Sequence, residues 1–139
     1  MTTIFSRIIR GELPGTFVWR DDTVVAFMSI NPLARGHVLV VPVAEIDHWI
    51  DFDPALSAHL FEVAQAIGVA QEAAFECERV GLVIAGYEIP HAHVHVIPTN
   101  TMRELSFANA ATSFDPVDLA AAAESIRAQL RAAGHDQVA

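Results

Sequence analysis

The sequence is poor in cysteine and in positive charge, and both shortages exclude classes of function. Cys77 is the single cysteine, so the chain can form neither an internal disulfide nor a cysteine-rich metal site. Lysine and arginine number 8 against 17 acidic residues, which gives a formal net charge of −9 at pH 7. This charge disfavours nonspecific binding to nucleic acid, which requires phosphate neutralisation, but it allows a mononucleotide in a local pocket.

Long apolar runs are also missing. No segment approaches the roughly 20 apolar residues of a membrane span, and the first residues do not have the form of a signal peptide. We therefore expect a cytoplasmic protein with no membrane partner. Because 53% of the 139 residues are hydrophobic, the chain can bury the core of one domain, and disorder is not expected.

The most informative stretch holds three of the seven histidines, His91, His93 and His95, within five residues. The residues between and after them favour a strand. Side chains alternate along a strand, so the imidazoles would share one face and the intervening apolar residues the buried face. A polar surface, a metal site and a catalytic site all remain open as explanations.

The spacing limits the metal explanation. Strand residues four apart lie roughly 13 Å apart, so one ion could take only two of these histidines and would need another ligand, such as His37. In a catalytic site, one neutral imidazole would act as nucleophile or base while its neighbours bind an anionic group. A phosphate suits that arrangement, because its oxygens can accept hydrogen bonds from imidazoles on either side.

Three motifs, in order, resemble those of the histidine triad (HIT) family and cover most of residues 4–98. The segment His91–Ile97 is similar to the family's His-x-His-x-His-x-x motif with apolar x. The segment Gly36–Pro42 resembles its signature Gly-His-x-Leu-Val-x-Pro, and Ile4–Pro14 resembles its opening Ile-Phe-x-x-Ile-Ile-x-Gly-Glu-x-Pro.

Hydrophobic patterns and turn residues predict the elements. Strands are expected over 16–20, 23–30, 36–42 and 80–85 and at the histidines, with a short amphipathic helix over 4–10. Asp53-Pro54 should begin a long helix and Asp115-Pro116 a last one. With the resemblance, this predicts an α+β fold: an antiparallel five-stranded sheet, one long helix, a short N-terminal helix and a C-terminal helix. We expect one HIT-like domain over 1–139, with its core at 4–98 and a loop and helix at 99–135.

The long helix is apolar on more than one side. An apolar stripe runs from Leu56 to Ala74 at spacings of three and four, and Phe61, Ala64 and Gly68 lie on an adjacent face. Such a helix often packs against two partners. We expect the sheet on one side and a second copy of the chain on the other, as a homodimer; the alternative is that the C-terminal segment covers the second side.

The resemblance implies a metal-independent phosphoramidase or nucleotidyl hydrolase acting on a purine nucleoside phosphoramidate or a related nucleotide. His93 would attack the α-phosphorus and carry a nucleotidyl intermediate. His95 and His37 would donate to the phosphoryl oxygens, and His91 would orient the row or assist the leaving group. The residues expected to contact the nucleotide are Phe5, Ile8, Phe27, Ser29, Ile30 and Tyr87.

Departures from the family pattern leave other functions open. Ser29 stands where the family commonly has an aspartate that binds the ribose hydroxyls, and Tyr87 stands where it often has glutamine. They favour a non-catalytic nucleotide-binding or adaptor protein as the alternative; a metal-dependent hydrolase is the third possibility. Many relatives hold a structural zinc, and the matching positions here are Thr3, Ser6, Glu45 and His91. Because the two thiolates are absent, we expect no structural zinc and no cofactor.

Overall fold

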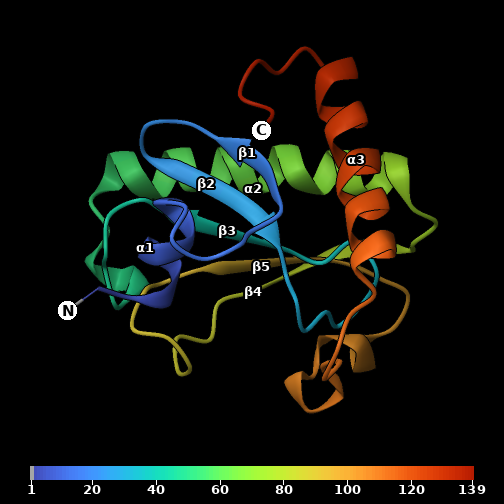
Figure 1. Ribbon diagram of the computed structural model, residues 1–139, viewed down its shortest axis with the longest axis horizontal. Helices are drawn as coiled ribbons and strands as arrows, with labels where there is room; N and C mark the ends of the chain where they lie inside the picture. The colour runs from blue at the N-terminus through green and yellow to red at the C-terminus, as the bar shows by residue number, and fades with distance from the viewer. Residues whose placement is uncertain (1) are drawn as a thin grey trace.

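The computed structural model describes residues 2–139, which fold into one five-stranded antiparallel sheet with helices on both faces (Figure 1). The sheet has the order β1-β2-β3-β5-β4, and the predicted α+β fold is confirmed. The strands are β1 (Phe17–Arg20), β2 (Val24–Met28), β3 (Val38–Pro42), β4 (Arg79–Val83) and β5 (Val94–Thr99). The helices are α1 (Ile4–Ile9), α2 (Pro54–Ala74) and α3 (Pro116–Ala132), with short 3-10 turns η1 (Trp49–Asp51), η2 (Met102–Leu105) and η3 (Phe107–Asn109).

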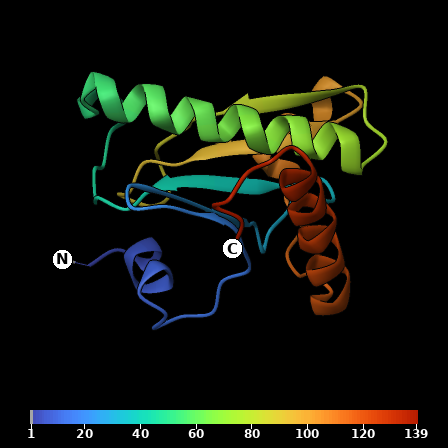
Figure 2. The same cartoon turned by 90° about the horizontal axis from the view of Figure 1, so that it is seen from above.

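The two faces of the sheet bury different side chains, as alternation along the strands requires. On one face α2 runs along the sheet and α3 lies near one end (Figure 2). That core includes Val94 and Val96 from β5, so the predicted burial of these two valines is confirmed. On the other face α1 covers a smaller cluster that includes Phe5, Phe27 and Leu39. The histidines lie on this second side.

Asp-Pro pairs begin both long helices, as predicted. The Asp53 carboxylate accepts a hydrogen bond from the Leu56 amide at 2.8 Å, and Pro54 is the first helical residue of α2. The Asp115 carboxylate accepts from the Val117 amide at 3.0 Å at the start of α3. In both helices the cap satisfies an amide that has no partner within the helix.

The C-terminal helix covers part of α2 and leaves another part open. Buried residues of α2 and α3 share one core cluster. Phe61 and Val69 of α2 nevertheless remain 60% and 63% exposed. The expected second apolar side is therefore only partly occupied by the chain's own C-terminal segment. Within residues 2–139, no helix is long and apolar enough to cross a membrane.

The triad is not entirely on a strand, which differs from the prediction. The strand β5 begins at Val94, so that only His95 of the three histidines belongs to it. The His91 amide donates to the Ile89 carbonyl and the Ala92 amide to the Ile46 carbonyl, each at 2.7 Å. These bonds tie the start of the triad to a turn and to the 43–48 loop, and the histidines do not form the straight row that strand geometry would give.

Candidate functional site

Four buried histidines meet on the α1 side of the sheet. His37 lies just before β3, and His95 lies on β5 opposite Leu39. The ring centroid of His95 is 5.1 Å from that of His37 and 4.8 Å from that of His93. The antiparallel pairing of β3 with β5 thus brings residues 58 positions apart in the sequence into direct contact.

Main-chain groups select the tautomers of His37 and His95. The Leu33 amide donates to Nδ1 of His37 at 3.0 Å, so a neutral His37 carries its proton on Nε2. That Nε2 lies 2.9 Å from Nδ1 of His95 and donates to it, which leaves the His95 proton on its own Nε2. His95 can therefore donate to a ligand. His37 has both nitrogens occupied by hydrogen bonds in this structure, which favours a role in orienting His95 over the expected direct donation to a phosphoryl oxygen.

The His93 ring is held the opposite way. Its Nδ1 donates to the carbonyl oxygen of His91 at 2.9 Å, which leaves a lone pair on Nε2. The His91 ring uses both nitrogens: Nε2 donates to the Pro42 carbonyl and Nδ1 accepts from the Thr3 hydroxyl, each at 2.7 Å. The site therefore contains one free imidazole lone pair, on His93, beside one free imidazole N–H, on His95.

Burial keeps all four imidazoles neutral. Burial, and next the nearby His93, lower the pKa of His37 from 6.5 to about 4. Burial, and then the neighbouring imidazoles of His37 and His93, lower the pKa of His95 to about 3. Burial also lowers the pKa of His91 and His93, although hydrogen bonds to backbone carbonyls oppose the shift. At neutral pH, His93 can act as a nucleophile and His95 as a neutral donor.

Three of the predicted nucleotide-binding residues form an apolar wall beside His93. The Phe5 ring packs edge-to-face on Phe27, with centroids 5.5 Å apart, and its centroid is 4.9 Å from that of His93. Ile8 of α1 packs against the same cluster. Such a wall suits the flat face of a nucleobase.

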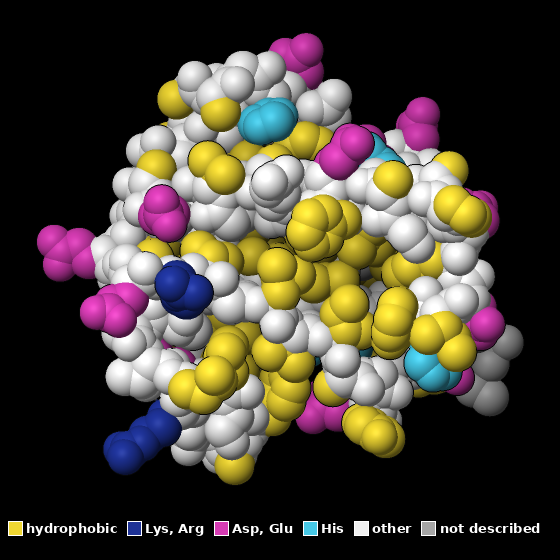
Figure 3. Space-filling model, turned by 180° about the vertical axis from the view of Figure 1, so that it is seen from behind, with side chains coloured by type: hydrophobic (Ala, Val, Ile, Leu, Met, Phe, Trp, Pro, Cys, Tyr) yellow, Lys and Arg dark blue, Asp and Glu magenta, His cyan; other side chains and the backbone are white. Residues whose placement is uncertain are grey.

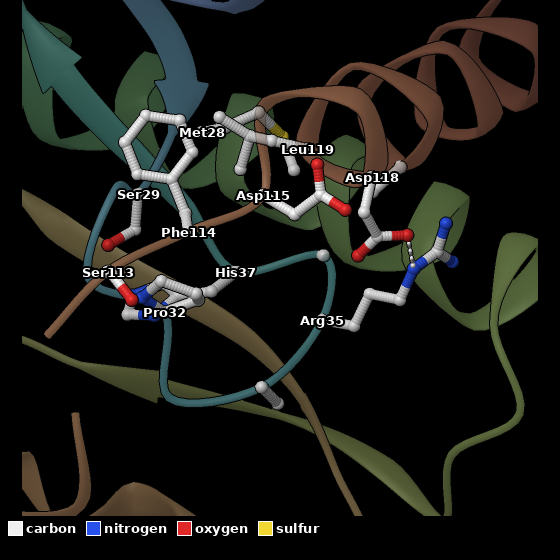
Figure 4. A pocket seen from close by; sticks show the side chains of 13 residues that line it. Met28, Ser29, Pro32, Arg35, His37, Ser113, Phe114, Asp115, Asp118 and Leu119 are labelled. Carbon is white, nitrogen blue, oxygen red and sulfur yellow. Dashed lines mark hydrogen bonds and ion pairs between the residues drawn. The ribbon is translucent and has the colours of Figure 1, made fainter. Parts of the chain in front are cut away.

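The other three lie apart from that wall. The Ser29 hydroxyl accepts a hydrogen bond from the Asn31 amide at 3.2 Å and borders a cavity of about 270 Å³ together with His37. Figure 4 shows this cavity between Ser29, Ser113 and His37 on one side and the Arg35–Asp118 ion pair on the other. Ile30 is 57% exposed and Tyr87 94% exposed, so most of each side chain faces solvent.

Phe107 is a residue of the site that sequence reasoning missed. It lies on η3, and its ring centroid is 4.8 Å from that of His95. The loop carrying it is attached to the segment after β2, since the Ala111 amide donates to the Pro32 carbonyl at 3.1 Å and the Asn31 side chain donates to the Ala111 carbonyl at 3.0 Å. The unusual length of the 99–114 loop was the one signal that this segment contributes to function.

The positions that match the family's zinc ligands do come together, but they do not fit a zinc ion. Besides its bond to His91, Thr3 donates its amide to Glu45 at 2.9 Å, and its hydroxyl accepts from the Ser6 amide at 3.1 Å. The groups satisfy one another, hydroxyls replace thiolates, and Nδ1 of His91 is occupied. Across residues 2–139, no group of three or more His, Cys, Asp or Glu could hold a metal ion.

The chain is similar to known proteins over most of its length. The HIT domain family model matches residues 10–102. An uncharacterized HIT-like protein from Borreliella burgdorferi is 36% identical over 102 residues, which cover 68% of this chain and 73% of that protein. The crystal structure of a hypothetical histidine triad nucleotide-binding protein from Sulfolobus tokodaii superposes with a TM-score of 0.81 at 26% identity, covering 92% of this chain and 91% of that one. That of a zinc-bound histidine triad family protein from Mycobacterium smegmatis also gives 0.81, at 25% identity and 96% coverage of both chains.

Proposed function

Because this chain belongs to the histidine triad (HIT) family, we propose that it is a metal-independent nucleotide phosphoramidase or nucleotidyl hydrolase. Its substrate would be a purine nucleoside phosphoramidate or a related nucleotide. The observation that carries the proposal is the lone pair on Nε2 of His93 beside the N–H on Nε2 of His95. This pairing places a nucleophile next to a donor for the charge that develops when phosphorus is attacked.

In the proposed reaction, Nε2 of His93 attacks the α-phosphorus and displaces the amine, which takes one proton from solvent as it leaves; the attacking water later returns a proton to solvent. A bond between His93 and phosphorus forms as the phosphoramidate bond breaks. Water then attacks the same phosphorus, releases the nucleoside monophosphate and returns His93 to its neutral form. His95 donates to a phosphoryl oxygen as charge builds, while His37 orients His95 and the His91 carbonyl orients His93.

The nucleotide contacts belong to the same proposal. Phe5, Ile8 and Phe27 form the wall against which a purine would lie. Ser29 and Ile30 would border the ribose, with Ser29 offering a hydroxyl in place of a carboxylate. Tyr87, on the exposed segment before the triad, would approach the phosphate from solvent.

We also propose that the protein forms a homodimer through α2 and β4. Hydrophobic side chains gather over these elements on the face seen in Figure 3. The exposed apolar side chains of these elements include Phe61 and Val69 of α2 and Leu82 of β4, and Ile84 follows directly after β4. Exposed apolar surface that is contiguous and lies beside an open strand edge is typical of a subunit contact.

The enzymatic proposal is tested with adenosine 5′-phosphoramidate and His93→Gly. We expect the unaltered protein to release AMP and to trap a nucleotidyl adduct on His93, visible by mass spectrometry after acid quench. The variant should form no adduct, and its activity should fall by on the order of 10³-fold or more. His48→Gly, at an exposed histidine, is the matched control and should retain activity.

The result separates the three functional classes. Binding of nucleotide without turnover would favour the adaptor function and contradict the enzymatic one. Loss of turnover on chelation would favour a metal-dependent hydrolase. Near wild-type activity of His93→Gly would remove His93 from the mechanism, whatever the substrate.

A further inference from the structure

Gln71 is a fully buried polar residue of α2 that the proposed chemistry does not use. Its side-chain nitrogen donates to the carbonyl oxygens of Gly36 and Val96, each at 2.9 Å. Its side-chain oxygen has no hydrogen-bond partner within the described chain. Burying an amide in an apolar core lowers stability unless its hydrogen bonds compensate. The two bonds that it does make therefore indicate what this residue does.

Both carbonyls are adjacent to histidines of the site. Gly36 immediately precedes His37, and Val96 immediately follows His95. The pairing of β3 with β5 ends at Val38 and Val96, so Gly36 lies beyond the last strand pair. The amide of Gln71 therefore joins the two chain segments at the point where the strand pairing between them stops.

A second contact holds Gly36 against the end of the same helix. Gly36 has a φ of +91°, and a Cβ placed on it would lie 2.4 Å from the Phe75 ring. Only glycine fits both this conformation and this closeness. The segment that leads into His37 thus contacts Gln71 in the last turn of α2 and Phe75, the residue directly after the helix.

On the opposite side of the sheet, the same two segments are joined by the bond from Nε2 of His37 to Nδ1 of His95, at 2.9 Å. A hydrogen bond between two rings weakens when its atoms move apart by a few tenths of an ångström. We infer that Gln71 is a positioning residue: its amide sets the separation of the Gly36–His37 and His95–Val96 segments and so maintains the bond that keeps the proton of His95 on Nε2. Its effect on catalysis rests on the proposed function, whereas the ring-to-ring bond exists in the free protein.

The test is Gln71→Met, which keeps much of the side-chain volume and removes the donor. We expect kcat to fall by about tenfold to a hundredfold with KM within about twofold, because a donor is misplaced while binding surfaces are unchanged. In long-range ¹H–¹⁵N NMR spectra of the free protein, His95 should change from the single Nε2-protonated tautomer to a mixture of tautomers. Gln65→Met, at an exposed glutamine of the same helix, is the matched control and should change neither readout.

If Gln71 stabilises the fold without positioning His95, the same measurements give a different result. Lower thermal stability of Gln71→Met with unchanged kcat and an unchanged His95 tautomer would overturn the inference. If Gln71→Met does not fold, Gln71→Asn keeps the amide but is too short to reach both carbonyls, and the same two readouts decide. If the unaltered protein hydrolyses no phosphoramidate, the proposed function fails, while the ring spectra still decide the role of Gln71.

Discussion

The four buried histidines should make the protein lose stability in mildly acidic solution. Burial lowers the pKa of each in the folded state, to about 4 for His37 and about 3 for His95, while unfolded histidine titrates near 6.5. Between these values the unfolded chain binds more protons than the folded one, so the free energy of unfolding falls as the pH falls from about 6.5 toward about 4. Each histidine adds a slope of up to about 1.4 kcal/mol per pH unit.

Urea denaturation at several pH values between about 7 and about 5 measures this slope. His95→Asn should reduce the slope by the share of one histidine, and His48→Asn, at an exposed position, is the matched control for removing a histidine. If His95→Asn reduces the slope no more than His48→Asn does, the His95 imidazole is not held neutral in the folded state.

Ser29→Asp should make the protein discriminate between ribose and 2′-deoxyribose substrates. Ser29 is buried and its hydroxyl already accepts a bond from the Asn31 amide, so it offers a ribose little beyond one weak contact. A carboxylate there can accept from two hydroxyls, and such charged hydrogen bonds are worth roughly 1.5–3 kcal/mol. We expect the kcat/KM ratio of adenosine to 2′-deoxyadenosine 5′-phosphoramidate to rise about tenfold or more in Ser29→Asp, and to change little in Ser29→Asn. Strong discrimination by the unaltered protein would place ribose recognition on another residue.

The sequence motifs indicate which residues belong to the site, but they do not indicate which hydrogen bonds those residues donate and accept. The spacing and the resemblance indicate His93 as nucleophile and His37 as a neighbour of the triad. The direction in which His37 donates depends on the Leu33 amide, and that of His91 on the Pro42 carbonyl. Main-chain groups carry no side-chain signature, so a sequence can suggest that His37 lies near the site without showing which atoms its two nitrogens contact.

At the scale of elements, the anchor of α1 is built from the positions that the resemblance assigns to the zinc ligands of some relatives. Thr3 caps α1 by accepting from the Ser6 amide, and it donates to His91. We predict that the purified protein holds no stoichiometric zinc and is unaffected by chelators. Thr3→Cys combined with Ser6→Cys should create a site for about one zinc per chain, because it places two thiolates beside His91 and Glu45. Metal analysis measures both, and the control combines Ser6→Cys with Thr2→Cys, which moves one thiol from the buried position 3 to the exposed position 2.

Two results would contradict that prediction. Stoichiometric zinc in the unaltered protein would mean that the hydrogen bonds between Thr3, Glu45 and His91 give way to a metal in solution. Equal zinc in the Thr2 control would mean that any two thiols near α1 suffice, without the ligand geometry of the native network.

The first residue of a helix was predictable where a nearby capping residue specifies it. The first residue of a strand was less predictable, because it depends on contacts with residues far away in the sequence. Asp53 and Asp115 each act within three residues of their own helix, so the starts of α2 and α3 could be inferred from sequence. The start of β5 depends on the contact from the Ala92 amide to the Ile46 carbonyl, 46 residues away. The 3-10 turn that places Phe107 beside His95 depends on packing with the segment after β2, for which the sequence has no pattern.

At the scale of the whole molecule, the two edges of the sheet differ. The C-terminal segment runs beside β1, where the Arg20 amide donates to the Gln137 carbonyl at 2.9 Å. It thereby covers one edge and removes it as a template for another chain. Within residues 2–139, the outer edge of β4 pairs with no other strand. Because this open edge lies beside the apolar side of α2, a second copy related by a two-fold axis could extend the sheet and bury both surfaces at once.

Leu82→Lys tests this assembly. Leu82 is exposed on β4, and a two-fold contact brings its two copies onto the same interface, so the substitution buries two like charges in each dimer. We expect sedimentation velocity to show a dimer for the unaltered protein and a dissociation constant raised at least about a hundredfold in the variant. Val117→Lys, at an apolar residue of α3 that is 78% exposed, should remain dimeric. A monomeric unaltered protein, or equal dissociation by the two lysine variants, would show that α2 and β4 do not form the subunit contact. The exposed apolar side of α2 would then be covered by something other than a second copy of the chain.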